Sequence, residues 1–476
     1  MSNVIDCKPR ETAPAPTEGP PARAASLGRL LGIDAARALA VFGMYYAHVG
    51  PFPEETGTWK SFLMEIPHGR SSALFATLAG LSLVLLAGGS RPKTGRPMRQ
   101  TVVRIVIRSL LLLALGSWLV ALGTSIVVIL AYYGLFFLLA LPFIKLRART
   151  LAIIAVGVGI GGPLLIQWLW STDTSWLDAF TAKDPLAMWS GEGLAALLFN
   201  GTYPGLAWMA YVFAGMAVGK LDLTGRAIQV RLLIVGPALA LLGYGGAWLL
   251  GKLLQTAGTA GSSVADASWN SFDQAMSKAL EGTDSANWDE EEWKAFDAEH
   301  ASIWELAPDE KAVSGGFDWT GLASASPHSN MPLELAGNIG VALTVIAGLV
   351  LLLGRFGRLR FWLAPLIAVG SMSLTAYVAH IAAVWYLVDH PADGVGYATG
   401  WRMWAVFVVA MLVFAPIWRR FCKRGPLEYP MYWATLPAKL LKSRPEPGAA
   451  DRPDRGARAG PRFPRTAPCD AIALRP

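Results

Sequence analysis

The chain has 476 residues, of which 53% are hydrophobic and only 16% are charged, and its net charge is +7. This composition is too apolar for a water-soluble globular protein of that length, so it excludes a soluble enzyme domain. In a soluble protein the positive charge would suggest nucleic acid. Here the Lys and Arg residues lie in short segments between apolar blocks. We therefore relate them to membrane topology and expect no nucleic-acid partner.

Apolar blocks are the main feature of the chain. A helix that crosses a hydrocarbon layer about 30 Å thick needs about 20 predominantly apolar residues. We therefore predict an all-α integral membrane protein, a polytopic bundle of about ten transmembrane helices with a polar extracytoplasmic segment. The predicted spans cover residues 31–49, 72–87, 106–121, 126–144, 151–170, 203–219, 232–250, 335–353, 362–388 and 403–418.

The basic residues orient these spans. Lys and Arg follow the even-numbered spans, as in the cluster from Arg91 to Arg108. Because loops rich in Lys and Arg face the cytoplasm, both termini are predicted to be cytoplasmic, in a plasma membrane. Between Asp266 and Asp318, fourteen acidic residues outnumber three lysines. The alternation of spans places that acidic stretch outside.

The pattern divides the chain into five segments. Residues 1–28, rich in Pro and Ala, are predicted to form a disordered cytoplasmic tail. Residues 29–254 hold the first seven spans and the outer loop with the candidate catalytic histidine. An acidic extracytoplasmic segment follows at 255–332, and the last three spans at 333–420. Residues 421–476 form a basic, mostly disordered cytoplasmic tail, with an interfacial piece expected near Tyr429.

Asp34 and Arg37 are charged residues inside the first predicted span. A charge there costs roughly 2.5 to 3.5 kcal/mol on insertion scales, so the pair needs a reason. The two residues are three positions apart and share one helix face. Either they pair with each other at the headgroup level, or they lie at the mouth of a cofactor channel. In both cases we expect them to face protein, not lipid.

All six histidines fall in outer loops or in the outer halves of spans in this topology, which predicts an outward-facing site. A neutral imidazole can take a proton from an amine or hydroxyl as it attacks a carbonyl. His68, in the segment Ile66-Pro67-His68-Gly69-Arg70, is the best placed base. The alternative is a loop histidine bonded to the backbone. His380 lies deep in a span, where we expect a hydrogen bond between helices.

Two outer turns complete the candidate site. Asn200-Gly201-Thr202-Tyr203-Pro204 precedes the sixth span, and Ser326-Pro327-His328-Ser329 precedes the eighth. These are either helix-entry turns or segments that close over an acceptor. We predict Arg70, Asn200, Tyr203 and His328 as substrate-binding residues. The chain lacks a paired spacing such as His-x-x-x-His, so no metal is expected.

These motifs resemble those of the membrane-bound acyltransferases related to heparan-alpha-glucosaminide N-acetyltransferase and of their uncharacterised bacterial relatives. The first motif runs from Arg29 to Arg37, and an apolar run after it ends at His48. The loop histidine with its Gly and a Gly-x-Ser element match His68, Gly69 and Gly80-Leu81-Ser82. Further similar segments are Tyr132-Tyr133-Gly134, Gly201-Thr202-Tyr203-Pro204, Pro327-His328-Ser329, Ser373-Leu374-Thr375-Ala376-Tyr377 and Gly425-Pro426-Leu427-Glu428.

The resemblance implies transfer of an acyl group from cytoplasmic acetyl-CoA to an extracytoplasmic sugar, lipid or metabolite. It assigns the catalytic role to His68, as general base or transient acyl carrier. His48 stands where the heparan enzyme has an asparagine, so the resemblance implies that His48 is a second catalytic residue, which orients the acceptor or polarises the thioester carbonyl. Acyl-CoA, membrane lipids and a small-molecule or glycan acceptor are the implied partners, and a homodimer is compatible with this.

The donor site is expected on the inner side. Asp34 and Arg37 would begin a polar path, and Arg99 and Arg104 of the basic inner loop would hold the phosphates of CoA. The same loop also satisfies the positive-inside rule without binding anything. Two other functions stay open on the sequence: a transporter or exporter of a small amphiphile, and a non-catalytic membrane protein.

Overall fold

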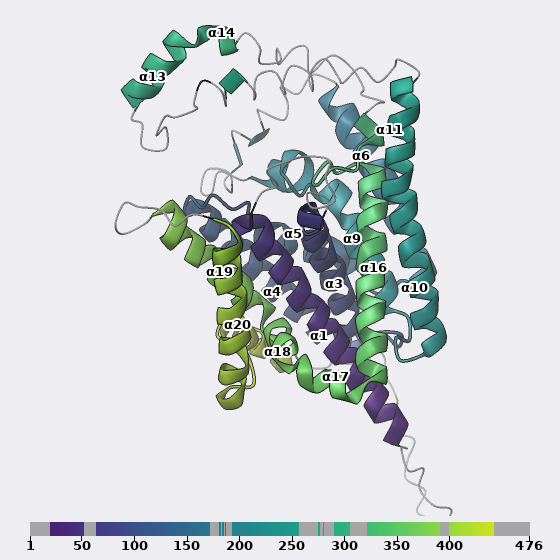
Figure 1. Ribbon diagram of the computed structural model, residues 1–476. Coiled ribbons are helices and arrows are strands. Elements are labelled where there is room, and N and C mark those ends of the chain that lie inside the picture. Colours follow the sequence, from purple (N-terminus) through teal and green to yellow (C-terminus); the bar gives the residue numbers. More distant parts are fainter. Residues whose placement is uncertain are drawn as a thin grey trace, which may run out of the picture.

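The structure is a computed structural model that describes residues 20–51, 63–171, 193–256, 290–304, 321–390 and 399–441, with a few single positions between 180 and 279. Every regular element in this part of the chain is a helix (Figure 1). The predicted all-α class is thus confirmed for these residues. Outside the described residues lie positions 1–19 of the tail predicted at 1–28, most of the acidic segment, and positions 442–476 of the basic tail.

The first half of the chain contains most of the helices that surround the candidate site. Their bounds are α1 (Pro20–Val49), α3 (Arg70–Leu86), α4 (Gly95–Ala121), α5 (Leu130–Ala140), η1 (Leu141–Phe143), α6 (Ala148–Trp170), η2 (Ala196–Asn200), α9 (Gly205–Gly219), α10 (Arg226–Ala240), η3 (Leu241–Gly245) and α11 (Gly246–Thr256). Because α1 begins at Pro20, the final part of the segment predicted as disordered is helical.

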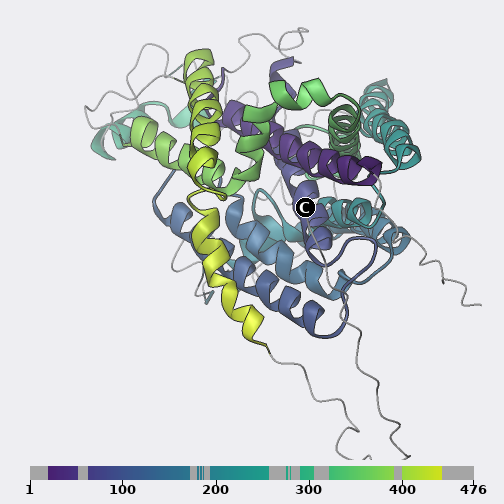
Figure 2. The ribbon, with the colours of Figure 1, turned by 90° about the horizontal axis from the view of Figure 1, so that it is seen from below.

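The second half adds a long helix, a broken span and two short helices near the end. The bounds are α13 (Glu290–Glu299), α14 (Ala301–Trp304), η5 (Gly321–Ala323), α16 (Pro332–Arg355), α17 (Gly357–Trp362), α18 (Ala364–Ser371), α19 (Ser373–Val384), η6 (Trp385–Asp389), α20 (Trp401–Phe421), α21 (Glu428–Ala434) and η7 (Leu436–Leu440). The short helices α21 and η7 lie against α4 (Figure 2). The predicted interfacial piece near Tyr429 is therefore a helix.

Among the described residues, six helices are long and apolar enough to cross a membrane, or seven if a bent pair counts as one span. The six are Leu63–Leu86, Gly95–Ala121, Ala148–Trp170, Arg226–Leu254, Pro332–Arg355 and Trp401–Phe421. Two further apolar helices, Leu130–Phe143 and Gly205–Gly219, are shorter. The chain is a multi-pass helical membrane protein, but the predicted count of about ten spans is not confirmed.

The predicted ninth span, at 362–388, is not one straight helix. It is divided into α17, α18 and α19, and the segments Ala364–Ser371 and Ser373–Asp389 meet at 83°. The break is at Met372, whose backbone leaves the helical region with φ −127° and ψ 42°. Glu428 stabilises this break, since its carboxylate accepts hydrogen bonds from the backbone N–H groups of Leu374 and Thr375 at 2.9 and 3.2 Å.

α1 lies at the centre of the bundle. It packs against α3, α16, α18, α19 and α20 (Figure 1). The start of α20 is anchored next to the end of α1, because the N–H of Gly400, the residue directly before α20, donates to the Val49 carbonyl at 2.8 Å. The end of the bundle that holds His48, His68 and His328 is called the histidine end below. The opposite end, with Arg37, Arg419 and Arg424, is called the arginine end.

Close helix contacts depend on small residues, as is usual where lipid provides no hydrophobic drive for association. α9 packs tightly on α3 and on α6. A Cβ built at Gly215 would collide with the backbone carbonyl of Thr77 on α3. Only glycine permits this approach, and it fixes α3, the helix that follows His68, inside the bundle.

Candidate functional site

His48 lies in the last turn of α1 and is paired with His380 of α19. The Nδ1 atom of His48 and the Nε2 atom of His380 are 2.9 Å apart. The two rings are stacked, with an interplanar angle of 5° and centroids 5.2 Å apart. His380 is 3% exposed. The predicted hydrogen bond between helices through His380 is therefore present, and its partner is the candidate residue His48.

His68 lies in the turn that connects residues 63–65 to α3. Its Nδ1 atom is 3.2 Å from the Met64 carbonyl oxygen, and its ring meets Tyr46 edge-on at 6.0 Å. Because a carbonyl only accepts, the proton is on Nδ1, and Nε2 carries the lone pair of the neutral ring. Gly69 follows with a φ of 67°, where a Cβ would press against Pro327. The local backbone thus requires glycine directly after the candidate base.

His328 is held by a loop that folds around a buried carboxylate. Glu334, 2% exposed, accepts the His328 N–H at 3.0 Å, the Ser329 hydroxyl at 3.0 Å and the Asn330 N–H at 2.6 Å. A fourth donor is the Asn338 amide, at 3.1 Å. His328 has a φ of 64°, which is uncommon outside glycine and is stabilised by these bonds.

The ring of His328 packs against aromatic residues of another segment. Its centroid is 5.4 Å from that of Tyr203 and 6.3 Å from that of Trp208. The Nδ1 atom of His328 is buried and has no hydrogen-bond partner within the described residues. Burial, and to a smaller degree the nearby His68, lower the pKa of His328 to about 4. The ring is therefore neutral at physiological pH.

This shift predicts a pH dependence of stability. The ordinary pKa of 6.5 applies to unfolded His328, so between that value and about 4 the unfolded chain binds more protons. The contribution of neutral His328 to the free energy of unfolding is fully present above pH 6.5 and is lost as the pH falls toward about 4. At pH 5 the loss is about 2 kcal/mol. His328→Asn, which tolerates a positive φ, should remove this part of the acid sensitivity. Thermal unfolding at pH 7 and pH 5 measures it, and an equal acid shift in both proteins would contradict the assignment.

A small cavity brings the histidine-end residues together. It has a volume of about 20 Å³, which is room for about one water molecule. Its lining combines residues from both halves of the chain: Met44, Ala47, His48, Pro67, Gly69, Ser71, Ser72, Ile129, Tyr203, His328 and Tyr377. Pro67 and Gly69, the neighbours of His68 in the chain, line this cavity, whereas the His68 side chain does not.

A larger cavity of about 490 Å³ extends from the arginine end. Arg37, Arg108 and Arg424 line it together with Glu428 and Tyr432. Ile129 and Tyr377 line both cavities. The Ile129 N–H donates to the Tyr377 hydroxyl at 3.2 Å, so these two residues form the boundary between them.

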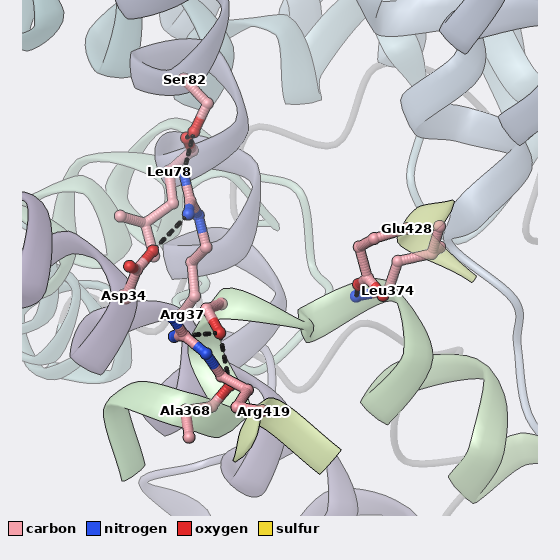
Figure 3. A network of polar contacts seen from close by, with 9 residues as sticks. Asp34, Arg37, Leu78, Ser82, Ala368, Leu374, Arg419 and Glu428 are labelled. Atoms are coloured by element: carbon pink, nitrogen blue, oxygen red, sulfur yellow. Dashed lines mark hydrogen bonds and ion pairs between the residues drawn. The ribbon is translucent and has the colours of Figure 1, made fainter. Parts of the chain in front are cut away.

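Polar contacts hold the arginine side of the larger cavity in place (Figure 3). Arg37 donates to Asp34 at 2.7 Å and to the Ser82 hydroxyl at 2.6 Å. Arg419 donates to the Ser371 hydroxyl at 2.8 Å. The predicted pairing of Asp34 with Arg37 is confirmed, and both face protein. Only Arg37 of the two lines the cavity.

The remaining predicted residues have different positions. Arg99 is exposed and Arg104 half-buried, and neither lines either of the two cavities described above. Arg70 donates to the Tyr244 hydroxyl at 3.0 Å and to the Glu65 carbonyl at 2.9 Å, so its contacts are with protein. Asn200 ends η2, and its side chain lies outside what the structure describes.

Arg108 was expected only as one member of the basic run from Arg91 to Arg108, and Arg424 was not expected in the site at all. Arg108 had a signal, because a charge that far along the membrane-spanning α4 is expensive and generally faces protein or a cavity. Arg424 directly precedes the Gly425-Pro426-Leu427-Glu428 segment, but no pattern in the sequence shows that this segment returns to α4 and α19.

Two family models match the chain. The catalytic domain of heparan-alpha-glucosaminide N-acetyltransferase matches residues 29–250, and a protein of unknown function (DUF418) matches residues 320–437. A curated relative, the "Uncharacterized 39.9 kDa protein in amylase 3'region" of Bacillus acidopullulyticus, is 34% identical over 86 residues. That match covers 17% of this chain and 25% of the relative, so the chain spans about a quarter of that protein's length.

The two matched regions both contribute to the site. His48, His68 and Tyr203 come from the first, and His328, Tyr377, His380 and Arg424 from the second. The resemblance inferred from the first motif and the loop histidine is thus confirmed, since residues 29–250 match the catalytic domain of heparan-alpha-glucosaminide N-acetyltransferase and residues 320–437 match a family of unknown function.

Proposed function

We propose that the chain is a transmembrane acyltransferase that moves an acetyl or other acyl group from acyl-CoA at the arginine end to an acceptor at the histidine end. The observation that carries the proposal is the shared boundary of the two cavities. Ile129 and Tyr377 border both the arginine-lined cavity and the small cavity with His48 and His328. A thioester entering from one end would meet the histidines at the other.

The larger cavity suits a CoA ester. Its volume of about 490 Å³ is within the range of about 300 to 1,000 Å³ typical of small-molecule sites. Arg37, Arg108 and Arg424 offer guanidinium groups for phosphate oxygens, and apolar residues such as Phe75, Leu112 and Phe137 line the rest. With basic loops facing inward, the arginine end is cytoplasmic and the acceptor, a sugar, lipid or metabolite, is extracytoplasmic.

The histidines supply the acid–base chemistry. The acceptor's oxygen or nitrogen forms a bond to the acyl carbon, the carbon–sulfur bond breaks, and the acceptor's proton passes through a histidine to the leaving thiolate. His68 is the proposed base, with the lone pair on Nε2. In the alternative order His68 Nε2 first attacks the acyl carbon and releases CoA, and the acceptor then takes the acyl group from the ring.

The direct test uses purified protein in detergent with radiolabelled acetyl-CoA. We expect release of CoA or transfer of label to protein or to an added amino sugar. If the folded protein neither binds acetyl-CoA nor releases CoA, the acyltransferase proposal is wrong. Uptake by proteoliposomes of an amphiphile would then favour the transporter alternative.

Arg108 gives a prediction about the donor site. Replacing it with glutamine removes charge-assisted hydrogen bonds worth about 1.5 to 3 kcal/mol, so the KM for acetyl-CoA should rise about 10- to 100-fold. The matched control is Arg99→Gln, because Arg99 is on the same helix and is exposed, as Arg108 is, but lines neither of the two cavities. Steady-state CoA release over a range of acetyl-CoA concentrations measures both. Equal KM values for the two variants would exclude the larger cavity as the donor site.

A further inference from the structure

His380 is a buried titratable residue that the proposed reaction does not yet use. It belongs to α19, in the region matched by the family of unknown function, and it is 3% exposed. Its Nε2 atom is 2.9 Å from Nδ1 of His48. Since His48 lines the small cavity and its Nδ1 is engaged, Nε2 is the ring nitrogen of His48 that remains for a ligand.

The backbone of both helices fixes this pair. One turn before it, the Tyr45 hydroxyl donates to the Ala376 carbonyl at 2.8 Å, which joins α1 to α19. The Tyr45–Ala376 and His48–His380 contacts therefore link α1 to α19 at two successive helical turns. The start of α19 is anchored in turn by Glu428, whose carboxylate also accepts the Thr375 hydroxyl at 2.5 Å.

Aromatic rings fix the orientation of His380 itself. Its centroid lies 4.6 Å from Tyr45, in a tilted arrangement, and 5.1 Å from Tyr377, edge-on. Tyr377 is one of the two residues on the boundary between the cavities. The surroundings of His380 therefore connect the boundary, the central helix and His48.

We infer that His380 is a positioning residue that holds His48 with Nε2 directed at the reacting groups and completes a two-histidine proton relay; this inference rests on the proposed acyl transfer. In the order in which His68 carries the acyl group, Nε2 of His48 takes the proton of the attacking amine or hydroxyl, and the N–H at its Nδ1 donates to His380 Nε2. The charge is then shared by two rings. The relay resets when His48 Nε2 gives its proton to the released thiolate, so protons balance over the cycle.

The activity test compares three variants. His380→Phe keeps a buried ring but no nitrogen, and we expect kcat to fall about 10- to 100-fold, as when a partner that orients a functional histidine is removed. The KM for acetyl-CoA should stay within about twofold, because the arginine-lined cavity is unchanged. His380→Gln, which offers an amide near the same place, should recover part of kcat. His390→Phe is the matched control, since His390 lines neither cavity.

A second readout does not depend on acyl transfer. With ¹⁵N-labelled histidine the chain gives signals from only six residues, and His48→Asn identifies those of His48. The ring-nitrogen shifts of His48 should change in His380→Phe and not in His390→Phe. Unchanged His48 shifts, or a wild-type kcat in a folded His380→Phe protein, would overturn the inference. If the wild type has no activity but the ring-nitrogen shifts of His48 still change in His380→Phe, the result would count against the proposed function and not against the pairing of the two histidines.

Discussion

Replacing His68 with alanine should lower the rate of acetyl transfer by a factor of about 10² to 10⁴, the usual contribution of a positioned acid–base group. The side chain contacts the Met64 carbonyl and the edge of Tyr46 and lies in a turn ahead of α3, so its loss should leave the bundle folded. Gly69, which the backbone of the turn requires, is untouched. CoA release from acetyl-CoA measures the effect.

His300→Ala is the matched control for that variant. His300 lies at the end of α13, its Nδ1 is 3.1 Å from the Phe296 carbonyl, and it lines neither cavity. The control should release CoA at the wild-type rate. A folded His68→Ala protein with wild-type turnover would remove His68 from the mechanism.

The same comparison separates the two chemical orders. If His68 carries the acyl group, acid-quenched wild type keeps radiolabel on the protein and His68→Ala does not. If His68 is only a base, neither protein is labelled, although turnover still depends on His68. Mass spectrometry of the peptide that contains residues 66–70 locates the label.

Replacing Glu334 with alanine should destabilise the protein more than any surface change. The carboxylate accepts four hydrogen bonds in a site where Glu334 is 2% exposed. Each donor left unpaired in a buried place costs about 1 to 3 kcal/mol, so we expect a loss of at least about 3 kcal/mol. The loop that carries His328 should also lose its positive-φ conformation, and with it acyl transfer. Denaturant unfolding in detergent measures stability.

Two variants calibrate that result. Glu334→Gln keeps one acceptor oxygen but turns an amide N–H₂ toward the remaining donors, so its stability should be intermediate. Glu299→Ala removes an exposed carboxylate from α13 and should change the free energy of unfolding by no more than about 0.5 kcal/mol. Near-wild-type stability of Glu334→Ala would show that the loop does not depend on the carboxylate.

Local patterns were sufficient for several parts of the site. Residues three apart share a helix face, so pairing was one of the two alternatives for Asp34 and Arg37, and the pair is present. His68 was expected in an outer loop between Pro67 and Gly69, and the structure places it in a turn in which Gly69 has a positive φ. The family followed from short motifs, because the residues that define it lie within a few positions of one another.

The donor residues show where local patterns fail. Arg99, Arg104 and Arg108 belong to one basic run, and the positive-inside rule treats them alike. Arg99 and Arg108 are exposed and Arg104 is half-buried, but only Arg108 lines the larger cavity, and this depends on which face of α4 meets α5, α21 and η7. A membrane helix is apolar on most of its surface, so its sequence does not show which face is packed against protein.

By itself, the sequence determined that the chain is helical and membrane-embedded, that its histidines and its basic residues belong to opposite ends, and which family it resembles. These properties depend on composition and on neighbours in the chain. Only the tertiary structure decided that His48 pairs with His380, 332 positions away, and that Tyr377 lies where two cavities meet. Such contacts are made when helices distant in sequence pack together, and they are selected by shape and by hydrogen bonds that no local period encodes.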